Sequence, residues 1–272
     1  MQKKALELSL YVAGAGAFGV FLRWLQVMIA FNDLGLVNRS AFNVLLPLFL
    51  AAAAAVFLRF LQQDEKAHLF VPEDFSEALG NTGRLYAGLS WVAGAIMIVG
   101  ALALLSKSET AKYVRFLRVL SAMAALTGVC VPLTMAMANR EEKNRTVLCL
   151  LTLVPVLFFA AWLIYIYRVN SINSVRWAYV PEIGTVILSM CAFARIAGFA
   201  YDSPKGKRAR FDAMLAATLC LMSLADERYT GMQLMYLATA AMLMLYNWAM
   251  ICNLEERRPQ PKRPPQDGFE RL

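Results

Sequence analysis

Eight apolar blocks, most of them about as long as a membrane-spanning helix, run through this sequence. A helix needs about 20 apolar residues to cross the hydrocarbon layer of a bilayer. The composition agrees: 59% of the 272 residues are hydrophobic and 17% are charged, whereas soluble domains carry about 25% charged residues. We therefore predict an all-α fold, a polytopic transmembrane helical bundle of about eight spans. The predicted spans are Leu6–Phe31, Ala41–Leu61, Leu85–Leu105, Phe116–Ala138, Val147–Tyr167, Trp177–Ala200, Phe211–Ala225 and Met232–Cys252.

The seventh block, 211–225, is the shortest and could instead be a half-inserted segment. The distribution of lysine and arginine favours a full crossing. With eight crossings, about twice as many of these residues fall on the side of the two chain ends as on the opposite side, and the richer side is expected to be cytosolic. We predict a membrane domain over residues 1–252 and a disordered, basic, proline-rich cytosolic tail over 253–272. Short loops and the lack of an evident targeting signal favour a plasma membrane, and a bacterial one.

Arg23 is the most informative charged residue, because it lies well inside the first predicted span. It stands about 25 Å along the helix from the cytosolic boundary, and a charge at that depth costs several kcal/mol unless it is paired or hydrated. Gln26 follows one turn later. At a similar depth in the sixth span lies Glu182, and Thr185 and Ser189 continue from it along one helical face. We predict that Arg23 pairs with Glu182 at the outer half of the bundle.

Two roles for this pair are open. Arg23 and Glu182 could form a structural ion pair that fixes the packing of the first and sixth spans. Alternatively, they could line a water-accessible pocket in which Arg23 binds an anion. Two other arginines near the spans need no such role: Arg59 and Arg195 both lie near cytosolic ends, where a long side chain can reach the headgroups.

Small residues and prolines indicate where the spans should approach closely or bend. Glycine, alanine and serine at helical spacing let neighbouring helices pack tightly in a membrane, and proline removes a backbone hydrogen bond within a span. The small residues are Ala15 and Gly19; Ala87, Gly94 and Ala101; and Ser121, Ala125 and Gly128. The prolines are Pro132, Pro155 and Pro181.

Most enzyme chemistry is absent from the sequence. His68 is the only histidine, which excludes bis-histidine haem ligation and the two-histidine HExxH zinc motif. No phosphate-binding loop, dinucleotide fingerprint or metal-ligand spacing is present. We therefore expect no enzyme, no cofactor and no metal. The net charge of +8 is explained by cytosolic loops beside anionic lipids, so no nucleic-acid partner is expected.

Two functions remain. The first is a permease or transporter-like protein that handles a small, anionic solute near Arg23 and Glu182. The second is a non-transporting membrane subunit, sensor or assembly factor that contacts lipid or a protein partner through the cytosolic loop 62–84 and the basic tail. In that loop, Pro72 followed by "EDFSEAL" predicts a short helix with Phe75 and Leu79 on one side, lying on the membrane surface. An intramembrane enzyme acting on lipid ranks lowest.

Overall fold

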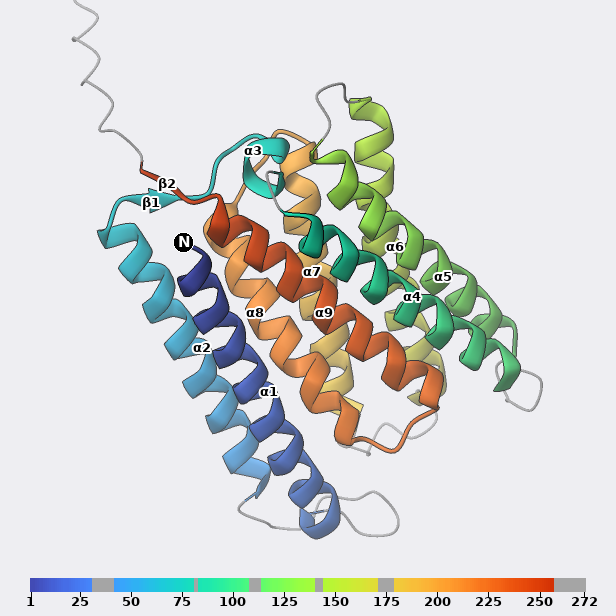
Figure 1. Cartoon of the computed structure of the whole chain (residues 1–272). Coiled ribbons are helices and arrows are strands. Elements are labelled where there is room, and N and C mark those ends of the chain that lie inside the picture. Colours follow the sequence, from blue (N-terminus) through green and yellow to red (C-terminus); the bar gives the residue numbers. More distant parts are fainter. Residues whose placement is uncertain (31–41, 81–82, 108–113, 140–143, 171–178, 257–272) are drawn as a thin grey trace, which may run out of the picture.

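A computed structural model of the chain describes residues 1–30, 42–80, 83–107, 114–139, 144–170 and 179–256. These residues form an almost entirely helical bundle (Figure 1), so the predicted fold class is confirmed. The long helices are α1 (Gln2–Ala30), α2 (Phe42–Lys66), α4 (Arg84–Lys107), α5 (Val114–Met137), α6 (Arg145–Asn170), α7 (Val180–Ala200), α8 (Gly206–Met222) and α9 (Thr230–Cys252).

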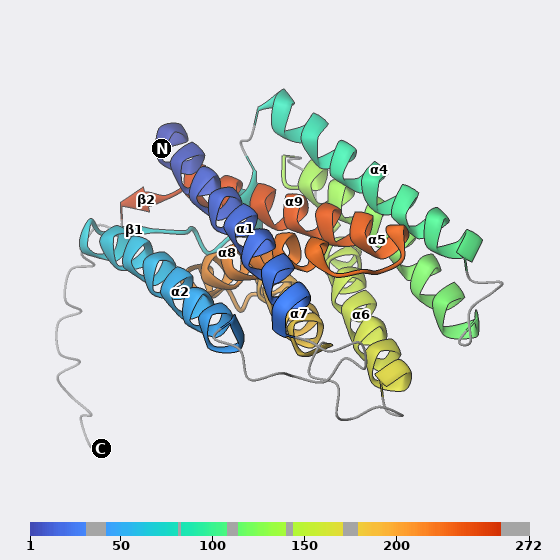
Figure 2. The same ribbon diagram turned by 90° about the horizontal axis from the view of Figure 1, so that it is seen from below.

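Six of these helices form a closed cycle of neighbours. The order of packing is α4, α5, α6, α7, α8 and α9, and α9 returns to α4. Helix α1 packs outside this cycle against α8 and α9, and α2 packs on α1 and α8 at the edge (Figures 1 and 2). Inside the cycle lies a cluster of buried aromatic side chains, whose rings are in contact: Phe158, Phe159, Trp162, Phe193, Tyr236 and Tyr246.

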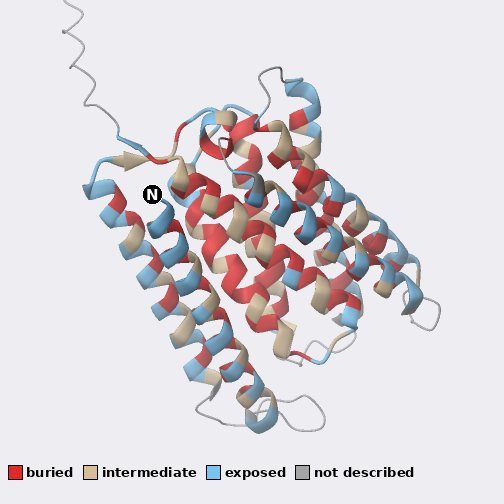
Figure 3. Ribbon diagram, viewed as in Figure 1, coloured by how far each residue is buried: buried red, intermediate tan, exposed pale blue. Residues whose placement is uncertain are grey.

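Seven helices in the described residues are long and apolar enough to cross a membrane. The eighth long helix, α8, is shorter. It begins at Gly206, ends at Met222 and continues as a 3-10 turn, η3 (Ser223–Ala225). Its 17 residues extend about 26 Å, close to the roughly 30 Å of hydrocarbon. Figure 3 shows the buried residues gathered on α8 and α9. Because α8 is enclosed by α1, α2, α7 and α9, it needs no lipid-facing apolar surface.

The observed helix bounds lie within five residues of the predicted ones. Helix α7 begins at Val180, so Pro181 occupies its first turn and breaks no helix. Proline suits that position because its missing N–H would have no partner there anyway. The predicted limits Phe31, Ala41 and Trp177 lie outside the described residues.

Glycines set the closest helix crossings. Gly94 on α4 meets Gly128 on α5, and a Cβ built on Gly128 would lie 2.7 Å from the carbonyl oxygen of Gly94. Gly100 on α4 meets Gly231 on α9 in a similar way, at 2.9 Å. Gly94 and Gly128 were both predicted to mark close helix contacts, and the structure brings them against each other.

The loop after α2 folds back onto one end of the bundle. Strand β1 (Leu69–Phe70) pairs antiparallel with β2 (Glu255–Glu256). The predicted helix is present as α3 (Phe75–Leu79), capped by the side chain of Asp74. Its apolar residues are buried against the bundle, where α3 packs on α9, rather than lying on a membrane surface. Residues 253–256 belong to the folded unit as well, four residues beyond the predicted boundary; the rest of the tail lies outside the described residues.

Candidate functional site

Arg23 lies about two turns before the end of α1, and α1 ends on the side of the bundle opposite α3 (Figure 1). The side chain of Arg23 is only 2% exposed. Its Nε donates a hydrogen bond to Oδ1 of Asp226 at 2.7 Å, and its Nη1 donates to Oε1 of Gln26 at 2.6 Å. Asp226 immediately follows the 3-10 turn at the end of α8. Gln26 in turn donates to Asn43 near the start of α2 at 3.2 Å. One buried guanidinium therefore ties α1 to α2 and to the α8–α9 connection.

The same cluster continues through the α8–α9 connection to α7. The second carboxylate oxygen of Asp226 lies 3.3 Å from Nη2 of Arg228. Nη1 of Arg228 lies 2.5 Å from Oε2 of Glu182, and the hydroxyl of Tyr236 donates to the other oxygen of Glu182 at 3.4 Å. Positive and negative groups thus alternate from Arg23 to Glu182. We call Arg23, Asp226, Arg228 and Glu182 the Arg23 network.

The predicted direct pairing of Arg23 with Glu182 is wrong within the described residues. Both side chains lie in one cluster, as their depths indicated, but Asp226 and Arg228 stand between them. The prediction considered only charges inside apolar blocks. The segment "DER" (226–228) directly after the short seventh block carries Asp226 and Arg228 back to the same level. Its position beside the end of a span was the signal that could have identified them.

The Arg23 network is balanced and nearly closed. Two guanidinium groups face two carboxylates, and Arg228, with a side chain 16% exposed, is the most accessible of the four. Burial alone would lower the pKa of Arg228, but the carboxylates of Glu182 and Asp226 raise it above its ordinary value, so Arg228 stays protonated. Its Nε is buried and has no hydrogen-bond partner among the described residues.

The predicted polar stripe on α7 faces α8. The hydroxyl of Thr185 lies 3.0 Å from that of Ser223, and the hydroxyl of Ser189 lies 3.4 Å from the sulfur of Cys220. Further along, Arg195 forms an ion pair with Asp212, so the expectation that Arg195 merely reaches the headgroups misses a partner. Helices α7 and α8 run antiparallel. Their facing polar side chains therefore form an interrupted polar seam from the Arg23 network towards the other end of the bundle.

A second charged cluster lies at that other end, between α2 and α8. Nη1 of Arg210 donates to Oδ2 of Asp64 at 2.8 Å, and both side chains are almost completely buried. Lys4 on α1 also pairs with Asp64. On the surface beside them, Lys207 pairs with Glu65 at 2.5 Å. Ion pairs therefore secure both ends of α8, since Arg210 and Asp212 lie near its start and Asp226 just beyond its end.

Within the described residues no group of three or more His, Cys, Asp or Glu side chains could hold a metal ion. Comparison with protein-family models, with curated proteins and with solved structures found no match for this chain.

Proposed function

We propose that this chain is a membrane transport protein whose solute, a small molecule with an anionic group, binds at the Arg23 network. The observation that carries the proposal is the chain of four charges, three buried and one, Arg228, partly exposed, which continues as paired polar side chains between α7 and α8. Ionisable groups within membrane helices are costly, and they commonly mark solute and ion pathways. A purely structural clamp between α1 and α7 would need a single ion pair.

Arg228 is the group from which solute binding would start. It is the most exposed member of the network and has a buried donor, Nε, to spare. An incoming carboxylate or phosphate could take the place of Glu182 or Asp226 beside this guanidinium, since arginine binds such groups through parallel N–H donors. The displaced carboxylate, Glu182 or Asp226, would no longer be neutralised by Arg228 and would repel the other carboxylate. This repulsion would favour separation of α7 from α8.

The seam between α7 and α8 contains an apolar interruption. Between the Ser189–Cys220 contact and the Arg195–Asp212 pair, the antiparallel register places Ala192 opposite Ala216, and both are fully buried. A solute could not pass this level without a movement of α8 relative to α7. Such a rearrangement is the ordinary requirement of alternating access, in which one helical unit rocks against another around a fixed site.

The test is a thermal-stability screen of the purified chain against small carboxylates, amino acids and phosphates, with Arg228→Gln and Arg145→Gln alongside. A ligand of the folded state at a hundredfold excess over its dissociation constant adds about 2.7 kcal/mol of stability. Arg145 pairs with Asp202 at the exposed surface far from the network, so its variant controls for lost positive charge. We expect a solute that stabilises wild type and Arg145→Gln but not Arg228→Gln, and that accumulates in proteoliposomes containing the protein. A screen in which no solute distinguishes the variants would reject the proposal.

The second candidate is a non-transporting membrane subunit that binds a protein partner. It is favoured by a groove of about 410 Å³ at the α3 end of the bundle, whose walls include the acidic residues Glu73, Glu77, Glu255 and Glu256. A basic segment of a partner would be attracted there. The two candidates differ in their response to charge reversal: Glu255→Lys with Glu256→Lys would abolish partner binding and leave solute-dependent stabilisation unchanged.

A further inference from the structure

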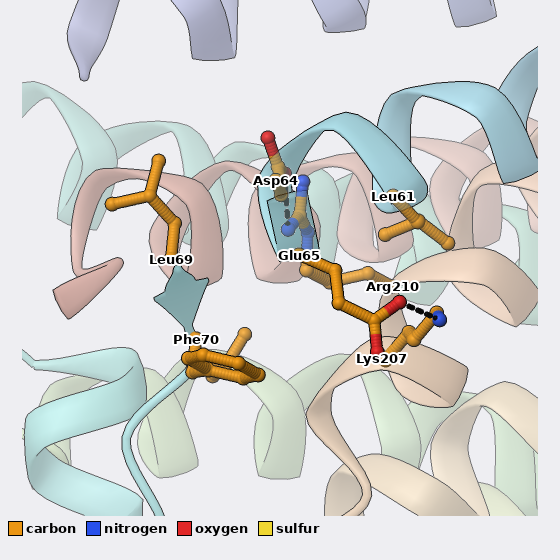
Figure 4. Close-up of a pocket in the computed structure, with 8 residues that line it drawn as sticks. Leu61, Asp64, Glu65, Leu69, Phe70, Lys207 and Arg210 are labelled. Carbon is orange, nitrogen blue, oxygen red and sulfur yellow. Dashed lines mark hydrogen bonds and ion pairs between the residues drawn. The ribbon is translucent and has the colours of Figure 1, made fainter. Parts of the chain in front are cut away.

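A small cavity lies at the end of the bundle opposite the Arg23 network, and the proposed transport function makes no use of it. Its volume is about 100 Å³, well above the roughly 10–15 Å³ that one water molecule requires. The end of α2, strand β1 and the start of α8 enclose it (Figure 4). The charged residues on its wall are Asp64, Glu65, Lys207 and Arg210, and Leu61 and Phe70 supply apolar surface.

Arg210 carries unused hydrogen-bonding capacity at this cavity. Its side chain is 2% exposed, and only Nη1 donates to Asp64. Nε and Nη2 are buried and have no hydrogen-bond partner among the described residues. These two nitrogens lie on one edge of the planar guanidinium, the edge that binds a carboxylate or phosphate through two parallel N–H bonds. Buried donors of this kind are rarely left without a partner in folded proteins.

The charges at the cavity favour an anion over a cation. Both carboxylates are already engaged, Asp64 by Arg210 and Lys4 and Glu65 by Lys207. The wall thus carries two cationic and two anionic side chains, Lys4 adds a third cation beside Asp64, and the unsatisfied atoms of Arg210 are donors. Lys207 is about half exposed and its ammonium group can leave Glu65 at little cost. It could then provide a second cationic contact to a ligand held by Arg210.

We propose that this cavity is a binding site for a phosphate group, held by the Nε–Nη2 edge of Arg210 and by Lys207. A phosphate group would accept hydrogen bonds from both unsatisfied donors of Arg210, and Lys207 would balance part of its charge. Because α2 ends and α8 begins here, the site lies at the boundary of the membrane domain, within reach of both aqueous phosphate compounds and lipid headgroups. The phosphate could belong to either source. This site is separate from the Arg23 network and its existence does not depend on transport.

The experiment measures thermal unfolding of the full chain in a phosphate-free detergent. Inorganic phosphate is titrated against chloride at matched ionic strength, and phosphatidylglycerol is titrated against phosphatidylcholine. Arg210→Lys keeps the positive charge beside Asp64 but removes the fork, and Arg208→Lys is the matched control on the exposed surface of the same helix. Lys207→Gln changes an exposed residue, so it tests the contribution of the site to phosphate binding even if Arg210→Lys does not fold.

We expect phosphate or phosphatidylglycerol to stabilise wild type and Arg208→Lys. The dissociation constant should be about tenfold or more higher for Arg210→Lys, and it should be higher for Lys207→Gln as well. Stabilisation by inorganic phosphate assigns the site to soluble phosphate compounds, and stabilisation by phosphatidylglycerol alone assigns it to lipid headgroups. No stabilisation of wild type by either probe, or equal stabilisation of all four proteins, would overturn the proposal and leave the cavity to water.

Discussion

Replacing Asp226 by asparagine gives the most direct test of the Arg23 network. The substitution preserves the shape of the side chain and removes its charge. In the native protein, this carboxylate lies 2.7 Å from Nε of Arg23 and 3.3 Å from Nη2 of Arg228. At an effective dielectric constant of about 20, these separations correspond to gross attractions of about 6 and 5 kcal/mol. The cost of desolvating the charges has already offset most of that attraction.

The expected loss is therefore smaller than the gross attraction, but it is large for one substitution. Without the charge of Asp226, Arg228 keeps the carboxylate of Glu182, whereas the buried Arg23 loses the carboxylate beside its Nε. Removing one partner of a buried ion pair typically costs about 3–5 kcal/mol, because the remaining charge stays buried without compensation. We expect Asp226→Asn to lower the free energy of unfolding by this amount.

Asp202→Asn is the matched control. Asp202 also pairs with an arginine, Arg145, but the two side chains are 73% and 62% exposed. An exposed pair of this kind contributes about 0–1 kcal/mol. Unfolding would be followed by circular dichroism in mixed micelles of increasing denaturing detergent. The double variant Arg23→Gln, Asp226→Asn should lose less free energy of unfolding than the two single variants lose together, and the difference should be about 0.5–3 kcal/mol. If Asp226→Asn remains within about 1 kcal/mol of wild type, the buried charges do not hold the bundle together as argued.

Three further predictions concern packing, the α3 end and orientation. Gly94→Ala should destabilise the fold by about 1–3 kcal/mol, because its Cβ would meet the backbone of Gly128 and lie 2.8 Å from Cγ of Pro132. The control, Gly88→Ala on the same helix, has open space around it and should not destabilise the fold. Equal melting temperatures for the two variants would argue against a tight crossing at Gly94. Asn253→Ala removes the side-chain amide that donates to the carbonyl oxygens of Ala78 and Gly80 at 3.1 and 2.6 Å. Hydrogen exchange in α3 should therefore accelerate, while the middle of α9 stays protected. Unchanged exchange in α3 would show that other contacts hold this helix in place. With both chain ends in the cytosol, Ser203→Cys should be shielded from a membrane-impermeant maleimide in intact cells, and Tyr229→Cys should react with it. Labelling is measured against wild type, which has five cysteines of its own. The reverse labelling pattern would show that the predicted orientation is inverted.

Some of the site could be read from residue types and depth. Arg23 and Gln26 are correctly identified as buried and polar, and Glu182 with Thr185 and Ser189 does face inward. Hydropathy suffices for this, because a charge within an apolar helix must have a polar environment somewhere in the bundle. The identity of the partner does not follow from depth, since every span contributes residues at each level.

The missed residues share one physical reason. Asp226, Arg228, Asp64 and Arg210 lie at or beyond the ends of apolar blocks, where the sequence alone cannot distinguish a charge in water from one folded against the bundle. Only the packing of α8 inside the bundle buries these ends. The polar contacts from α7 to Ser223 and Cys220 depend on the same packing.

The sequence by itself determined the helical membrane architecture, because hydrophobic length dictates which segments can cross a bilayer and backbone hydrogen bonding requires them to be helices. Tertiary structure alone decided which charges are partners and where they are buried. Hydropathy acts on each segment independently, whereas an ion pair depends on the distance between side chains that are up to 203 positions apart in the chain, as Arg23 and Asp226 are.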